Sequence, residues 1–171
     1  MIDLRSQFEF EKGSFPNAVI IPILNDYERD KVGKEFNNFG KNSAINLGKK
    51  LVSHSKKNKR INMWLDHLNE FPESILFCMR GGLRSQIAQE WLKENGRDVP
   101  LIFGGYKKLR NYCMLTLDTI EQKKQKWIII GGRTGSGKTK LIKKISSSID
   151  LENIANHKGS AFGSNITSQP S

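Results

Sequence analysis

The chain has 171 residues, which is enough for one ordinary domain or for one domain and part of another. Its length and its 37% hydrophobic content suit a globular protein with a buried core and exclude a wholly disordered chain. It has two cysteines without a Cys-x-x-Cys pair, no signal-peptide pattern and no apolar run near the roughly 20 residues of a membrane span. These features predict a protein of the reducing cytoplasm.

Positive charge is the most informative feature of the composition, with a formal net charge of +11. Lysines and arginines cluster within residues 41–60, 107–110 and 123–126. A solvated helix face explains any single cluster equally well. Three clusters together favour a polyanionic partner such as nucleic acid, because neutralising phosphates releases counterions.

Strand-like and helix-like patterns alternate along the first 120 residues. In chain order they predict strands at 2–5 and 19–23, helices at 26–39, 44–51 and 61–68, a strand at 74–78, a helix at 83–95, a strand at 99–103 and a helix from 104. Asn25 or Asp26 is expected to cap the first helix, which Gly40 should end. The run at 74–78 lacks alternation, which is typical of a central strand covered on both faces. This order predicts an α/β domain over residues 1–120, with a mainly parallel sheet flanked by helices.

A second and shorter series of elements follows a charged linker at 121–126. The apolar segment 127–132 predicts a strand, and the residues after it predict a glycine loop and a helix that runs to about residue 148. From residue 160 onward the chain is polar, with no packing pattern. We therefore expect residues 127–171 to be the start of an incomplete second domain with a disordered tail.

Cys78 stands at the end of the expected strand 74–78, directly before a glycine-containing loop and a helix. The amides of such a loop and of the helix N-terminus can hold an anion. Positive charge beside the thiol would lower its pKa and make a thiolate available at neutral pH. The residues expected to form this anion-binding loop are Arg80, Gly81, Gly82, Arg84 and Ser85. A buried structural cysteine is the alternative, but this setting favours a catalytic nucleophile.

Cys113 has a different setting from Cys78. It lies in an apolar helical segment without a glycine loop, so we expect it to pack in the core. A role as a resolving thiol for Cys78 has weaker support. The histidines and cysteines lack zinc-ligand spacing, so no structural zinc is expected.

Residues 132–139, Gly-Arg-Thr-Gly-Ser-Gly-Lys-Thr, match the phosphate-loop pattern G-x-x-x-x-G-K-[ST]. In such a loop the amides cradle phosphates, Lys138 neutralises their oxygens and the Thr139 hydroxyl would hold Mg²⁺. The expected phosphate-binding residues are Gly132, Gly135, Ser136, Gly137, Lys138 and Thr139. No tightly bound cofactor is expected, and Mg²⁺ is the one metal that this motif allows.

The second domain lacks parts that nucleotide hydrolysis requires. Asp150 and Glu152 are the only acids after Lys138, and neither of them ends an apolar strand. Without a Walker B carboxylate, hydrolysis of ATP or GTP by this chain is not expected.

Several segments resemble one family when they are taken in order. The opening, from Ile2 to Ile23, resembles that of a rhodanese domain, although Ser14 and Phe15 replace the usual His and Ile. The further segments are "GSFPNAVIIPILND", "FCMRGGLRSQIAQEWLKENG", "GGYKKLR", "GGRTGSGKT" and "LENIANHKGSAFG". Together they resemble the tRNA 2-selenouridine synthases, over residues 2 to about 163.

The resemblance implies both an architecture and an activity. Members of that family join a rhodanese domain to a P-loop domain and replace the sulfur of wobble 2-thiouridine in tRNA by selenium. The expected donor is selenophosphate, and geranyl diphosphate first geranylates the sulfur to make it a better leaving group. Carried over, Cys78 is the essential rhodanese-type cysteine, and the loop of Gly137, Lys138 and Thr139 meets a phosphate or pyrophosphate. Family members are considerably longer, so the resemblance also implies a truncated P-loop domain and an activity crippled by it.

Three alternatives stay open on the sequence alone. The first is a plain rhodanese-type sulfurtransferase that carries a persulfide on Cys78. The second is a cysteine phosphatase, because Cys78 and Arg84 have Cys-x5-Arg spacing, although Phe77 stands where tyrosine phosphatases carry His. The third is a non-catalytic, basic tRNA-binding fragment.

Overall fold

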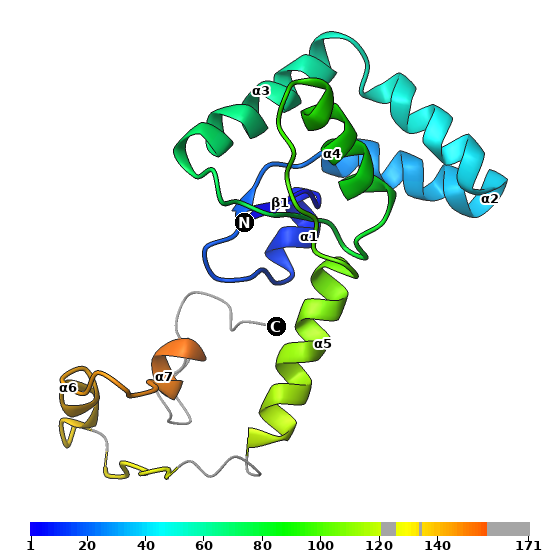
Figure 1. Cartoon of the computed structure of the whole chain (residues 1–171). Coiled ribbons are helices and arrows are strands. Elements are labelled where there is room, and N and C mark those ends of the chain that lie inside the picture. Colours follow the sequence, from blue (N-terminus) through cyan, green and yellow to red (C-terminus); the bar gives the residue numbers. More distant parts are fainter. Residues whose placement is uncertain (121–125, 134, 157–171) are drawn as a thin grey trace. The chain divides into compact units, whose positions relative to one another are not determined.

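The computed structural model describes residues 1–120, 126–133 and 135–156 (Figure 1). The chain divides into two compact units, Met1–Thr119 and Ile120–Ser171. The expected linker lies almost wholly outside the described residues, and so does the expected disordered tail from residue 160. No helix of the described part is long and apolar enough to cross a membrane.

The first unit is built on a small parallel sheet. Its strands are β1 (Ile2–Asp3), β2 (Val19–Ile20) and β3 (Leu76–Phe77), in the order β2-β1-β3. Ile2 of β1 lies opposite Val19 on one side and Leu76 on the other. The α/β class with a parallel sheet is thus confirmed, although the strands are shorter than predicted. The expected strand at 99–103 contributes one bridge, between Leu76 and Leu101.

The first unit also contains five helices. They are α1 (Gln7–Glu11), α2 (Asp26–Leu51), α3 (Ser55–Glu70), α4 (Leu83–Glu94) and α5 (Gly105–Asp118). α3 and α4 pack against each other, and α4 packs beside β3 (Figure 1). The strand–loop–helix order around residue 78 therefore places the loop after β3 at the start of α4.

Helix α2 starts where the sequence predicts and consists of two helical segments. Asn25 caps it: the Glu28 amide donates to Asn25 Oδ1 at 2.8 Å, and the Asn25 amide donates to Glu28 Oε2 at 3.0 Å. Gly40 interrupts α2, because its backbone is not helical at φ +82° and ψ −175°. The first helical segment therefore ends at Gly40 as predicted, and a second segment follows the kink and ends at Leu51.

The core of the first unit joins the sheet to α3 and α4. The largest fully buried side chain is that of Trp64, whose indole N–H donates to the Ile21 carbonyl at 2.9 Å. Its ring stacks with Trp91 of α4 at a centroid distance of 6.2 Å. Other large aliphatic side chains that are fully buried lie in or next to β1, in α3, in β3 and in α4, and are those of Ile2, Leu4, Leu68, Leu76 and Leu92. The helical stripe predicted at 61–68 therefore faces the sheet as expected.

The second unit contains two short helices, α6 (Lys138–Ile142) and α7 (Leu151–Ile154). The predicted strand at 127–132 does not form, and Ile129 is 94% exposed. A parallel strand needs a neighbour to accept and donate its backbone hydrogen bonds, and the described residues of this unit include no other strand. The helix expected to reach residue 148 ends at Ile142, because it too lacks a sheet to pack on.

Candidate active site around Cys78

Cys78 directly follows β3 and is 3% exposed. Two backbone hydrogen bonds tie the start of its loop to α5: the Tyr106 amide donates to the Cys78 carbonyl at 2.9 Å, and the Lys107 amide donates to the Met79 carbonyl at 3.0 Å. On its other side, the loop ends at Gly82, the N-cap of α4. The thiol is therefore held between a sheet and two helix N-termini.

Two glycines make this close approach of backbone segments possible. Gly81 has φ +61°, and a Cβ there would lie 2.6 Å from the Gly104 nitrogen. A Cβ on Gly105 would lie 2.1 Å from the Cys78 carbonyl oxygen. Larger residues are thus excluded from both positions. The sequence predicted a role for Gly81 within the loop but missed Gly105, which belongs to a helix far along the chain.

Several polar groups surround the Cys78 thiol. Ser85 Oγ lies 3.4 Å from Cys78 Sγ and also hydrogen bonds to the Gly82 carbonyl at 2.9 Å. Burial raises the pKa of the Cys78 thiol, but the Ser85 hydroxyl, the amides of Arg80 and Gly82 and the charge of Arg84 together lower it below its ordinary value of 9.0. The setting thus favours the thiolate more than the setting of an ordinary cysteine does.

Arg84 is held by a carboxylate that the sequence did not single out as a site residue. Its guanidinium donates to both oxygens of Glu9 on α1, at 2.6 and 3.0 Å. Glu9 also accepts from the Ser6 amide at 3.1 Å and lies 3.6 Å from Arg29 Nε. Burial raises the pKa of Glu9, but Arg84, the Ser6 amide and Arg29 outweigh it and lower that pKa. The capping-box pattern Ser6-x-x-Glu9 could have drawn attention to this residue.

The expected loop residues occupy different places around one opening. Cys78, Arg80, Gly82 and Arg84 line a cavity of about 750 Å³, together with Lys107 at the start of α5. Ser85 is fully buried behind the thiol, whereas Arg80 is exposed. Most charged groups at this cavity are cations, so it suits an anionic ligand.

The phosphate-loop residues form a separate group in the second unit. Lys138 Nζ donates to the carbonyls of Gly132 and Arg133 at 2.8 and 3.1 Å, and Gly137 is the N-cap of α6 with φ +84°. The other described loop residues, Gly135, Ser136 and Thr139, are exposed, and Thr134 lies outside the described residues. The Lys138 ammonium group thus binds carbonyl groups of its own loop.

Two further predictions from the sequence concern Cys113 and metal binding. Cys113 is exposed, so the prediction that it packs in the core is wrong. The apolar segment around it belongs to α5, of which Gly105 alone is buried. In the described part of the chain, no three His, Cys, Asp or Glu side chains lie close enough to hold a metal ion.

The basic cluster at 41–60 has both structural and unpaired members. Arg60 and Lys56 pair with the buried Glu28, at 2.6 and 3.4 Å, and Lys57 pairs with Glu94 at 3.1 Å. Lys41, Lys49, Lys50 and Lys59 are exposed, and no ion pair joins them to the described acids. Part of this cluster is thus available to a polyanion.

Curated proteins from several bacteria match the chain over its whole length. The tRNA 2-selenouridine synthase of Sulfurovum sp. (strain NBC37-1) is 52% identical over 171 residues, which is 99% of this chain and 46% of that protein. Proteins of the same name from Shewanella frigidimarina and Nitrosomonas europaea are 47% and 48% identical over 100% of this chain, which is 46% and 45% of their own lengths. Along its length, this chain is related to the tRNA 2-selenouridine synthases. It spans a little under half of each of these relatives.

The chain also matches a family model and a solved structure. Residues 125–171 match the model of the tRNA 2-selenouridine synthase AAA domain. A crystal structure of the N-terminal domain of a Clostridium difficile 630 protein described as ATP/GTP-binding is similar, with a TM-score of 0.57 and 27% identity over 66% of this chain and 87% of that one. Because the second unit is less than a third of the chain, that match reaches well into the first unit.

Proposed function

We propose that this chain forms the selenium-transferring part of a tRNA 2-selenouridine synthase. In this proposal the sulfur of wobble 2-thiouridine in tRNA is replaced by selenium, with selenophosphate as donor and after geranylation from geranyl diphosphate. The proposal assigns a rhodanese-like fold to the first unit and the beginning of a P-loop domain to the second. Similarity to synthases over the whole chain supports it.

The single observation that carries the proposal is the setting of Cys78. A buried thiol with a lowered pKa, at the mouth of a basic cavity, is suited to form a bond to an electrophile or to hold an anionic cargo. Arg80, Gly82 and Arg84 would bind the anion. The Ser85 hydroxyl would stabilise the thiolate once it turns from the Gly82 carbonyl, to which it now donates. Glu9 positions Arg84 through two hydrogen bonds from the guanidinium group.

The phosphate loop has a supporting role in this proposal. Gly132, Gly135, Ser136, Gly137 and Lys138 would bind a phosphate or pyrophosphate of the prenyl donor or of the tRNA. Thr139 would hold Mg²⁺, which would neutralise phosphate charge when it is bound. Lys138 would first have to leave the carbonyls of Gly132 and Arg133 that it now contacts.

A hybrid enzyme tests the proposed activity. The matching segment of the Sulfurovum relative is replaced by this chain, so that the remaining half of the enzyme is supplied. Incubation with selenophosphate, geranyl diphosphate and 2-thiouridine tRNA, followed by mass spectrometry of the nucleosides, should detect 2-selenouridine. A hybrid that folds and binds tRNA as the Sulfurovum protein does, yet forms no 2-selenouridine, would refute the proposal.

The tRNA partner has its own test. Binding should weaken steeply as salt rises, because phosphate contacts with the exposed lysines release counterions. Replacing Lys49, Lys50 and Lys59 by glutamine should reduce the slope of log affinity against log salt, by roughly one for each lysine that binds a phosphate. Binding that does not depend on salt would contradict a role for these lysines.

A further inference from the structure

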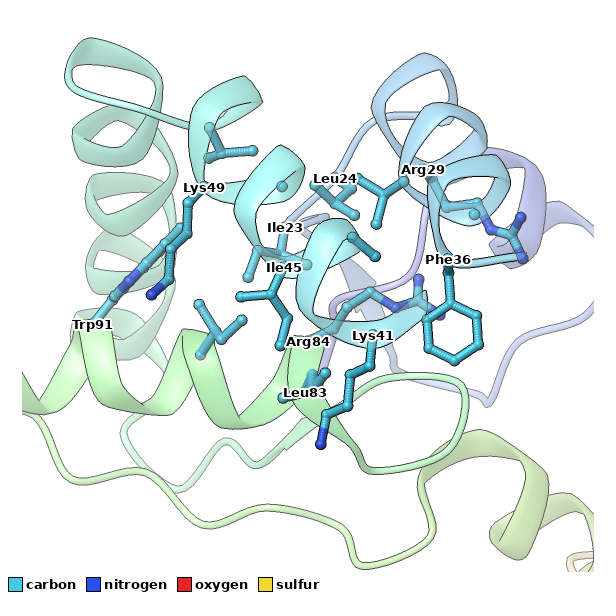
Figure 2. Close-up of a pocket in the computed structure, with 16 residues that line it drawn as sticks. Ile23, Leu24, Arg29, Phe36, Lys41, Ile45, Lys49, Leu83, Arg84 and Trp91 are labelled. Atoms are coloured by element: carbon cyan, nitrogen blue, oxygen red, sulfur yellow. The ribbon is translucent and has the colours of Figure 1, made fainter. Parts of the chain in front are cut away.

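A second cavity, of about 310 Å³, lies in the first unit between α2 and α4. Its size is at the lower end of the roughly 300–1,000 Å³ that small-molecule sites occupy. Most of its lining is aliphatic or aromatic, and Figure 2 shows Ile23 and Ile45 near its centre, with Leu24 and Phe36 toward one side and Trp91 on the other. Aliphatic walls of this kind bind apolar groups, because they remove apolar surface from water.

The charged residues that line this second cavity all have the same sign. They are Arg29, Lys41, Lys49 and Arg84, and no acid lines it. Glu9 compensates the two arginines, whereas no ion pair joins Lys41 or Lys49 to an acid in the described part of the chain. An apolar interior with a cationic edge is complementary to an apolar chain that bears an anionic group.

The second cavity adjoins the cavity that contains Cys78. Arg29, Gly33, Phe36, Leu83 and Arg84 line both cavities. Gly33 lies close to one of these shared residues, since a Cβ at that position would come within 3.3 Å of the Arg29 guanidinium. A ligand whose apolar chain fills the second cavity would therefore place its polar end beside the anion-binding loop.

We propose that the cavity between α2 and α4 binds the apolar chain of a small amphiphilic anion, whose charged end lies toward the Cys78 loop. The inference deepens the proposed function and rests on it for the identity of Cys78 as the reacting centre. It assigns both ends of such a substrate to the first unit, so that of the two phosphate sources named above the phosphate loop would meet that of the tRNA. Leu24, Val32, Ile45 and Ile87 contact the chain, and Lys41 and Lys49 attract the anion.

The test uses this chain with two probes that share a head group, octyl phosphate and methyl phosphate. Titration calorimetry should show octyl phosphate binding more than about tenfold tighter, because its chain buries additional methylene groups. Octyl phosphate should also slow the alkylation of Cys78 by iodoacetamide, whereas the alkylation of the exposed Cys113 should not change. Equal affinities for the two probes, or equal protection of both cysteines, would overturn the inference.

A matched pair of variants locates the binding site. Ile45→Trp fills the cavity and should weaken octyl phosphate binding by about tenfold or more while leaving the binding of methyl phosphate unchanged. Leu47→Trp adds the same side chain to the same half of α2, but at a residue that does not line the cavity, and should change affinity by less than about twofold. Equal effects of the two variants would contradict the assignment. Protection of Cys78 in the unaltered chain decides the question even if Ile45→Trp does not fold.

These results can be separated from those of the hybrid enzyme. Failure to bind octyl phosphate overturns the cavity assignment and leaves selenium transfer untouched. Failure to form 2-selenouridine, together with chain-dependent binding at the cavity, overturns the activity and leaves the binding site in place.

Discussion

The chain contains two glycine loops that suit anions, and they differ in what surrounds them. The loop after Cys78 follows a strand that is paired on both sides, and backbone bonds from Tyr106 and Lys107 hold it. The loop before α6 follows the segment 127–132, which is exposed and unpaired. In the first loop the cations face a cavity, whereas in the second Lys138 contacts the loop's own carbonyls.

This difference shows that a loop motif does not suffice to form a binding site. Aligned amides and a focused positive potential require a fixed strand before the loop and a packed helix after it. The first unit supplies both within its described residues, and the second unit, with two helices of five and four residues, does not. Substitutions in each unit can test whether the two loops differ in this way.

The largest effect is expected from Cys78→Ser in the hybrid enzyme. Formation of 2-selenouridine should fall on the order of a thousandfold or more, because a hydroxyl is a far weaker nucleophile than a thiolate. Nucleoside mass spectrometry measures the loss. Cys113→Ser is the matched control and should retain activity, since that thiol is exposed and lies outside the loop. Full activity of the Cys78 variant would remove the first loop from the mechanism.

A pair of tryptophans compares the packing of the two units. Trp64 is fully buried and bonded to Ile21, so Trp64→Ala should lower the free energy of unfolding by about 3–5 kcal/mol. Trp127 is 53% exposed, so Trp127→Ala should change it by less than about 0.5 kcal/mol. Urea denaturation followed by circular dichroism measures both. Trp64→Phe serves if the alanine variant does not fold, and similar costs at both sites would mean that 127–132 is packed.

The sequence predicts the first unit better than the second, and there is a physical reason for this. The helical stripe of Trp64, the cap at Asn25 and the strand before Cys78 are local patterns whose partners lie within the first 120 residues. The segment 127–132 has an equally clear strand pattern, but strand formation depends on neighbours that the described residues do not supply. The sequence identifies the residues of the phosphate-loop motif around Lys138, but it does not predict how they are arranged in this chain.

The candidate site shows the same limit at the level of single residues. Arg80, Gly82, Arg84 and Ser85 follow Cys78 directly, so their positions could be expected from the loop. Glu9 is separated from Arg84 by 75 positions, and its contact depends on how α1 packs near the loop. The burial of Cys113 was mispredicted because an apolar helical pattern does not identify the partner that covers it.

Glu9→Gln tests how far the first loop depends on this distant contact. Loss of the carboxylate charge should cost about 1–3 kcal/mol of stability, because Arg84 would be left with a weaker partner in a largely buried place. The pKa of the Cys78 thiol should fall further, since Arg84 would no longer be compensated. The pH dependence of iodoacetamide alkylation measures the second effect.

The control for this variant is Glu11→Gln on the same helix. Glu11 is exposed and accepts a hydrogen bond from the exposed Gln7 side chain. Its substitution should therefore change neither the stability of the protein nor the pKa of the Cys78 thiol. If the pKa of the Cys78 thiol is the same in both variants, Glu9 does not act on the thiol through Arg84.

Acid should weaken the first unit through two buried carboxylates. Burial raises the pKa values of both Glu9 and Glu28. Arg84 and the Ser6 amide lower the pKa of Glu9, and Arg60 and the Asn25 amide lower that of Glu28. Both pKa values therefore lie below the ordinary 4.5. The unfolded chain then binds protons more readily, so their contribution is complete above about pH 4.5 and is lost as the pH falls through the lower folded values. The urea concentration at the midpoint of unfolding should fall as the pH is lowered from about 5 to about 3. A variant with both Glu9→Gln and Glu28→Gln should show a weaker dependence of this midpoint on pH. An unchanged slope in that variant would exclude both carboxylates as the cause.

Only a small effect on stability is expected from Lys138→Ala in the second loop. The Lys138 ammonium group donates to the carbonyls of Gly132 and Arg133 in an exposed loop, so the free energy of unfolding should change by less than about 0.5 kcal/mol. Phosphate binding should respond differently in the two settings. In the chain alone, Lys138→Ala should leave the affinity for methyl phosphate nearly unchanged, because the unpaired segment before the loop does not align its amides. In the hybrid enzyme, where the rest of the domain can complete a sheet, the same substitution should weaken pyrophosphate binding by about tenfold or more, because the ammonium group would no longer donate charged hydrogen bonds to the phosphate oxygens. A loss of equal size in both settings would show that the motif is already formed without that sheet, and the contrast between the two loops would then lie in the sequence of each loop alone.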